Sequence, residues 1–423
     1  MNSQGQPFEI FNNLLFPKIF QTFRMAIQPG KLFVAFSAFA VICLVGWLMD
    51  LSQTVVVSPV AQGNISELQV YLNQPERVPL HITGYKITGG HAGVFSTMSS
   101  FASSRFQGAV EALLTLNLPT VVTDIADFIN ALSWSFRYHF IYSISFATIA
   151  FIVIAFAGGA ICRLAAVQFA RGEKAGLIEV LRFSKNNFTS FFAAPLAPLG
   201  VAIVAGLVIS LLGLIVNIPF AGELIMAITI FPALMGGLII TILLILTIAG
   251  FSLMFPAIAC DKSDFFDAIC KAFIYVFVKP WRIGFYTVIA AVYGAICYTF
   301  VRFCTFLLLS TTYLFMQLSI LADSSTNETT KLNAIWSEPQ FKNLLGYSTA
   351  MALNGTESIA AYVVHISLLA VVGLLIAFVI SFYFSANTII YTLLRNKVDS
   401  TPLSEVYLGH SDGKTIQENK PQN

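Results

Sequence analysis

Six ionisable side chains near the ends of long apolar segments are the residues in this sequence best suited to chemistry. They are Asp50, Arg137, His139, Glu223, Arg302 and His365. Ionisable groups at membrane depth usually face protein or water, and they often mark ion or substrate pathways. We expect all six near the outer interface, with Arg302 paired to Asp50 or Glu223. The alternative, which we favour, is that they are interface anchors and structural ion pairs.

A second set of charges lies in two short amphipathic segments between apolar runs. In 177–185, Glu179 and Arg182 fall within one helical turn, and in 265–273 Asp267 and Lys271 do the same. Charges three or four residues apart stabilise an exposed helix face. We therefore predict two cytoplasmic interfacial helices. Negative charge suits the start of the second helix, which Asp261, Ser263 and Asp264 precede.

Catalytic and metal-binding motifs give a largely negative result. The sequence contains no phosphate-binding loop, dinucleotide fingerprint, zinc-protease motif or Cys-x-x-Cys pair. Gly409 to Gly413 matches Gly-x-Ser-x-Gly, but it lies in a polar tail without the flanking strand and helix that the motif needs. We expect no enzyme, no cofactor and no metal site.

Composition indicates a membrane protein. Of 423 residues, 57% are hydrophobic and only 10% are charged, far from the balance of a soluble domain. The net charge of +2 does not favour a nucleic-acid partner. About six apolar runs are long enough to cross roughly 30 Å of hydrocarbon. They are 32–50, 140–162, 191–216, 224–259, 283–320 and 359–386.

The distribution of Lys and Arg predicts the orientation. Basic residues gather before the first run, between the second and third, between the fourth and fifth, and after the sixth. Because basic loops stay in the cytoplasm, this pattern places both termini there. The fifth run exceeds one upright span, and Arg302 is the expected place for a tilt, a kink or the start of a surface helix.

The resulting fold prediction is an all-α polytopic helix bundle with a small outward cap. The units 140–217 and 224–301 each hold a span, a cytoplasmic amphipathic helix and a returning span, which indicates two parallel hairpin repeats. Any two hairpins with a polar linker would look similar, so the alternative is no true repeat. The predicted segments are an interfacial amphipathic helix (1–31), the first span (32–50), the cap (51–139), a four-span core (140–320), an outward loop (321–358), the last span (359–386) and a disordered cytoplasmic tail (387–423).

Two stretches carry a resemblance to a known family. The segments 158–173, beginning Gly-Gly-Ala-Ile-Cys-Arg, and 253–282, ending Val-Lys-Pro-Trp-Arg, resemble a family of uncharacterised multi-pass bacterial inner-membrane proteins. The likeness covers about 8–300 and implies a location and a fold, but no activity. A looser likeness is to the membrane domain that accompanies some glycerophosphodiester phosphodiesterases. This chain lacks their soluble catalytic barrel, so their activity is not implied.

Three functional classes follow. We favour an integral membrane scaffold or accessory subunit, with the lipid bilayer and a membrane-protein partner or a second copy as its contacts. The second is a transporter or permease-like protein that uses a polar site between the repeats. A membrane-embedded enzyme is third, because clustered His, Asp or Glu at one depth are few. A polar cavity reaching mid-membrane would favour transport, whereas a closed bundle with a large exposed apolar flank would favour the scaffold.

Overall fold

The computed structural model describes residues 15–60, 63–173, 175–215, 222–320, 332, 335–341, 343–345 and 355–407. The chain divides into two compact units. Unit 1 combines Met1–Ile161 with Gly284–Ala386, and unit 2 combines Cys162–Ile283 with Asn387–Asn423.

The described residues contain six helices long and apolar enough to cross a membrane, as the sequence predicts. They are α3 (Pro29–Met49), α8 (Phe140–Arg171), α10 (Phe188–Ile215), α11 (Gly222–Asp261), α13 (Pro280–Ile320) and α15 (Gly355–Val398). The predicted fold class, an all-α polytopic membrane protein, is confirmed. Arg302 does not interrupt the fifth run, because α13 is one helix of 41 residues.

The cap of unit 1 follows α3 and combines a small sheet with helices. Strand β1 (Val55–Val60) pairs antiparallel with β2 (Gly63–Ser66) and with β3 (Gly90–Ala92). The helices are α4 (Glu67–Asn73), the 3-10 helix η3 (Pro75–Arg77), α5 (Val78–Tyr85), α6 (Val94–Leu114) and α7 (Leu118–Tyr138). A core that includes Val55, Leu68 and Trp134 joins sheet and helices. The sequence favours irregular or β-like structure over about 51–93 and two helices over 95–116 and 120–136. The structure has strands β1–β3 and helices α6 and α7 there, and it adds α4 and α5.

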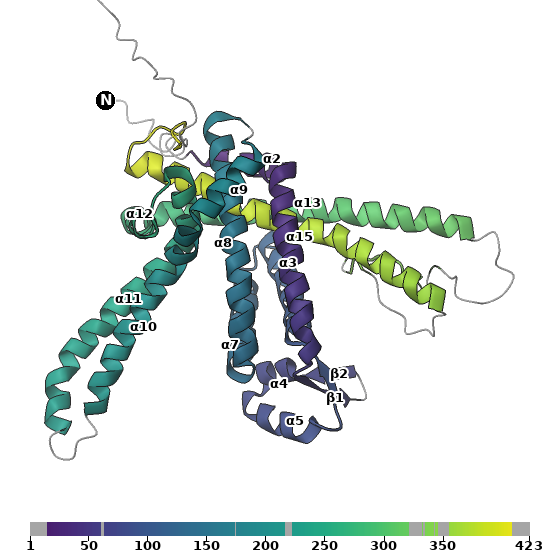
Figure 1. Ribbon diagram of the computed structural model, residues 1–423, viewed down its shortest axis with the longest axis horizontal. Helices are drawn as coiled ribbons and strands as arrows, with labels where there is room; N and C mark the ends of the chain where they lie inside the picture. Colours follow the sequence, from purple (N-terminus) through teal and green to yellow (C-terminus); the bar gives the residue numbers. More distant parts are fainter. Residues whose placement is uncertain are drawn as a thin grey trace, which may run out of the picture. The chain divides into compact units, whose positions relative to one another are not determined.

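Unit 2 contains an apolar hairpin and two short helices. Helices α10 and α11 run side by side, and both contact α12 (Phe265–Val278) (Figure 1). Helix α9 (Leu177–Asn186) precedes α10. The predicted short helices therefore exist where the sequence places them. Helix α12 buries Ala268, Ala272 and Tyr275, whereas Phe266 and Phe277 are exposed.

Both ends of the described chain differ from the prediction. In the described part of the predicted amphipathic helix 1–31, the chain forms a 3-10 helix, η1 (Phe16–Gln21), with Pro17 in its first turn, followed by α2 (Thr22–Ala26). This segment packs inside unit 1, where the hydroxyl of Tyr293 donates to the carbonyl of Phe20 at 3.0 Å. Residues 1–14 and 408–423 lie outside the described residues, as does most of the outward loop 321–358.

The predicted disordered tail begins too early. Helix α15 continues through 387–398, and residues 399–407 pack within unit 2. The sequence does not predict this packing, because the segment is held largely through its backbone carbonyl groups, which every residue type carries.

Candidate functional site

The carboxylate of Asp261 joins three helices of unit 2. Asp261 ends α11, where the left-handed backbone of Lys262 stops the helix. Its Oδ2 accepts hydrogen bonds from Nζ of Lys271 on α12 at 3.0 Å and from the hydroxyl of Tyr391 on α15 at 2.7 Å. Its Oδ1 accepts one from Nη1 of Arg395, one turn after Tyr391. We call these four residues the Asp261 network.

A second arginine completes this end of unit 2. Arg163 on α8 donates from Nη1 to the carbonyl of Ala259 at 2.8 Å and from Nη2 to the carbonyl of Tyr407 at 2.6 Å. The last carbonyls of α11 lack helical partners and carry the negative end of its dipole, so they attract a guanidinium. Arg395 also donates to the carbonyl of Glu405. Two arginines therefore hold segment 399–407 against the helix ends.

Of the two predicted interfacial charge pairs, one forms. Lys271 contacts Asp267 at 2.9 Å in addition to Asp261. Glu179 and Arg182 are both exposed and do not form an ion pair with each other. Helix α9 leaves both of these residues exposed and buries Val180.

Two groups of α12 titrate abnormally. Burial alone would lower the pKa of Lys271, but hydrogen bonds to Asp267 and Asp261 raise its pKa above the ordinary value of 10.5. The contribution of this lysine to stability is therefore fully present below pH 10.5 and is lost as the pH rises through the raised pKa. Burial and a hydrogen bond to the carboxylate of Asp399 raise the pKa of Tyr275.

In unit 1, Asp50 caps the start of α6. Its Oδ1 and Oδ2 accept hydrogen bonds from the backbone N–H groups of Phe95 and Ser96, both at 2.8 Å. The hydroxyls of Ser96 and Tyr142 also donate to it, the latter at 2.7 Å. A carboxylate at a helix N-terminus is stabilised by unpaired N–H groups and by the dipole. Gly93 makes this approach possible, since a β-carbon there would lie 2.0 Å from Cγ of Asp50.

Arg302 does not pair with Asp50, although both lie in the described part of unit 1. Its Nε and Nη2 donate to the carbonyl of Phe341 at 3.1 and 2.8 Å. Nη2 also donates to Oε1 of Gln107 at 3.1 Å, and Nη1 to the hydroxyl of Tyr298 at 3.2 Å. The expected ion pair with Asp50 is therefore wrong, because a backbone carbonyl and two neutral side chains accept from the guanidinium.

The other residues of the expected polar layer have separate surroundings. Nε2 of His139 lies 3.3 Å from Oε2 of Glu67, whose side chain is 1% exposed and whose other oxygen accepts from the N–H of Val56 at 2.7 Å. Arg137 and His365 are exposed. The side chain of Glu223 lies outside the described residues.

The sequence did not indicate Glu67, Arg163 or Tyr391 as site residues. The one available signal was the spacing of Tyr391 and Arg395, which lie one helical turn apart after an apolar run.

These charged groups hold helices in position. Asp50, Glu67 and Asp261 each accept several internal hydrogen bonds, so their oxygens are occupied by protein donors. Within the described ranges, no group of three or more His, Cys, Asp or Glu could hold a metal ion. The geometry is therefore that of structural clamps at helix ends.

Comparison with known proteins adds no assignment: no protein-family model, no curated protein and no solved structure matches this chain.

Replacing Asp261 with Ala should destabilise the protein strongly. The change leaves the guanidinium of Arg395, 6% exposed, without its carboxylate, and breaking a buried pair costs about 3–5 kcal/mol. Thermal unfolding in mild detergent measures the loss. Asp264→Ala is the matched control, because Asp264 is exposed and its side chain makes no cap hydrogen bond. Equal midpoints for the two variants would contradict the assigned role.

Gly93→Ala should also destabilise, by roughly 1–3 kcal/mol, because the new methyl group overlaps the carboxylate of Asp50. Gly84→Ala serves as the control, since no atom lies within 4 Å of the position its β-carbon would take. That control should be neutral or slightly stabilising, as alanine favours helix over glycine. Chemical denaturation of both variants in detergent tests this difference.

Proposed function

We propose that this chain is an integral membrane scaffold or accessory subunit, and that the α10–α11 hairpin is the part that associates with another membrane-spanning helix. It acts without catalysis of its own. The proposal places it in a bacterial inner membrane with both termini in the cytoplasm, in agreement with the family resemblance and the basic loops.

The observation that carries the proposal is the exposure of the hairpin. In the most apolar stretch of 18 residues in α10, only 11% is buried. This is the lowest buried share among the six candidate spans. Exposed positions include Ile203, Leu207, Phe231 and Ile248. Lipid chains can cover such a surface, so a second observation is needed to indicate a protein partner.

The second observation concerns glycine residues on the surface of the hairpin. Gly206 and Gly213 are seven residues apart and share one face of α10 with Ser210. Apart from the helix's own backbone, no atom of the described residues lies within 4 Å of the β-carbon that either glycine lacks, and the same holds for Gly237 on α11. Small residues at this spacing allow two helices in a membrane to approach closely. Because the hairpin's own packing does not use this space, a partner helix explains it.

The polar groups support a scaffold more than a transporter. A transport pathway needs polar side chains that are free to bind and release a substrate. Asp50 and Asp261 instead accept three or more hydrogen bonds each from their own units. Such saturated groups fix helices and offer little to a passing solute.

Gly206→Leu combined with Gly213→Leu should reduce co-purification of the partner at least tenfold. The bulky side chains fill the space that the approaching helix needs, and interface overpacking is costly. Affinity purification in mild detergent, with quantitative identification of co-purifying membrane proteins and measurement of particle mass, tests this and separates a second copy from another protein.

The matched control is Val204→Leu with Val208→Leu, on the opposite side of α10, where both valines are exposed. It should retain the partner. A wild-type chain that purifies as a monomer with lipid alone would refute the proposal.

The orientation is tested by cysteine labelling in a background without the six native cysteines. Lys86→Cys in the cap should react with a membrane-impermeant maleimide added to the outside, whereas Arg171→Cys at the end of α8 should react only after permeabilisation. Both positions are exposed in their own units, so burial does not explain protection. Reaction of Arg171→Cys in intact cells would reverse the proposed topology.

A further inference from the structure

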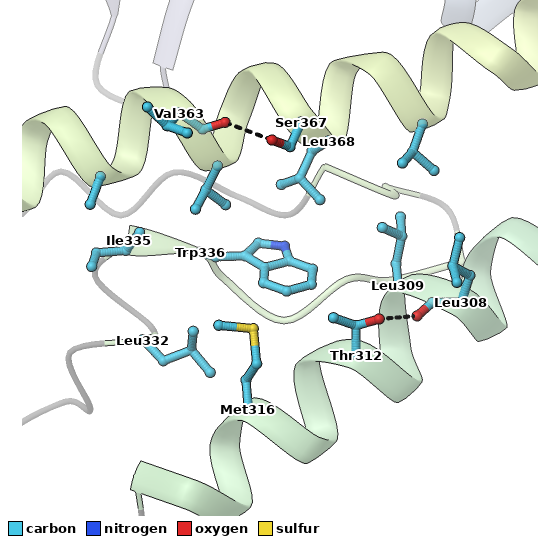
Figure 2. Close-up of a pocket in the computed structure, with 13 residues that line it drawn as sticks. Leu308, Leu309, Thr312, Met316, Leu332, Ile335, Trp336, Val363, Ser367 and Leu368 are labelled. Carbon is cyan, nitrogen blue, oxygen red and sulfur yellow. Dashed lines mark hydrogen bonds between the residues drawn. The ribbon is translucent and has the colours of Figure 1, made fainter.

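An apolar cavity of about 580 Å³ lies in unit 1 between α13 and α15. Leu332, Ile335 and Trp336 form a third wall (Figure 2). The helical stretches that line it belong to two of the candidate membrane spans, which lipid chains would surround in a bilayer. None of its thirteen lining residues carries a charge, and its volume is in the range of small-molecule sites.

The two hydroxyls in the lining donate to their own helices. Thr312 donates to the carbonyl of Leu308 at 2.8 Å, and Ser367 to that of Val363 at 2.9 Å. Both bonds are visible in Figure 2. Neither hydroxyl proton is therefore free to bind a ligand. The remaining lining residues are aliphatic, except Met316 and Trp336.

Trp336 supplies a donor that has no acceptor. The residue is 6% exposed, and its indole Nε1 has no hydrogen-bond partner among the described residues. Its ring lies between α13 and α15, with the nitrogen edge toward α15 (Figure 2), and packs edge-on against Tyr313 with centroids 5.5 Å apart. Buried N–H groups are nearly always paired, so an unpaired one in a cavity wall indicates a missing acceptor.

Arg302 holds the segment that presents Trp336. It donates twice to the carbonyl of Phe341, five residues after the tryptophan. The backbone N–H of Trp336 is itself bonded to the carbonyl of Leu332 at 2.7 Å. The indole is thus fixed in place before any ligand arrives, which lowers the entropic cost of binding.

We propose that this cavity binds one acyl chain of a membrane glycerophospholipid, and that the ester carbonyl of that chain accepts a hydrogen bond from Nε1 of Trp336. The aliphatic walls suit a hydrocarbon chain, and the single donor suits one carbonyl oxygen. A free fatty acid fits poorly, because its carboxylate would meet no cation among the described residues that line the cavity. This inference does not depend on the proposed scaffold function.

The test titrates a phospholipid with brominated acyl chains into the full chain in detergent and follows tryptophan fluorescence. Trp47→Phe and Trp281→Phe remove the two strongly exposed indoles. Adding Trp336→Phe to this background gives the signal to subtract. Quenching of Trp336 should saturate at one lipid per chain, and an ether-linked analogue, which lacks the carbonyl, should bind about fivefold more weakly.

Two variants control for packing. Ala360→Phe fills the cavity and should abolish saturable quenching, whereas Ala370→Phe, on an exposed position of the same helix outside the lining, should preserve it. Quenching that rises without saturation, or equally in both variants, would overturn the site. Equal affinity for ester and ether lipids would overturn the assignment of the carbonyl to Trp336.

Discussion

The structure depends on one constraint: a charge near hydrocarbon must find its partners inside the chain. Asp261 meets this constraint for unit 2, because its two oxygens accept from α12 and from two positions on α15. An unpaired carboxylate or guanidinium at low exposure would cost several kcal/mol, which exceeds the stability of most single contacts. The end of the apolar hairpin is therefore fixed to neighbouring helices by charge, while the hairpin itself is held by apolar packing.

In unit 1, backbone groups are among the partners that meet the same constraint at Asp50, Glu67 and Arg302. Asp50 is held by the first N–H groups of α6, and Glu67 accepts from the N–H of Val56 in β1. Arg302 has the opposite charge: its guanidinium donates a hydrogen bond to the backbone carbonyl of Phe341. Backbone dipoles have fixed directions, so these side chains set where a helix, a strand and a loop segment meet.

This choice of partner explains what the sequence could and could not predict. Apolar run length located the six long helices, and turn spacing located the Asp267–Lys271 pair, because both are local properties. Asp50 accepts from backbone N–H groups 45 and 46 residues away, and Arg302 donates to a backbone carbonyl 39 residues away. Every residue type carries these backbone groups. Side-chain type alone therefore suggested an ion pair between them where none exists. The packing of 399–407 was hidden for the same reason, since its contacts to Arg163 and Arg395 are carbonyls.

Glycine placement separates the internal requirements of the fold from those of a partner. In unit 1 a β-carbon at Gly46 would lie 2.4 Å from the ring of Phe95, and one at Gly294 would lie 2.8 Å from that of Phe382. These glycines are needed for packing within the chain. A β-carbon at Gly206 or Gly213 would meet no atom of the described residues outside its own helix backbone, although glycine inside a helix costs about 1 kcal/mol relative to alanine. The proposed approach of a second helix would offset this cost.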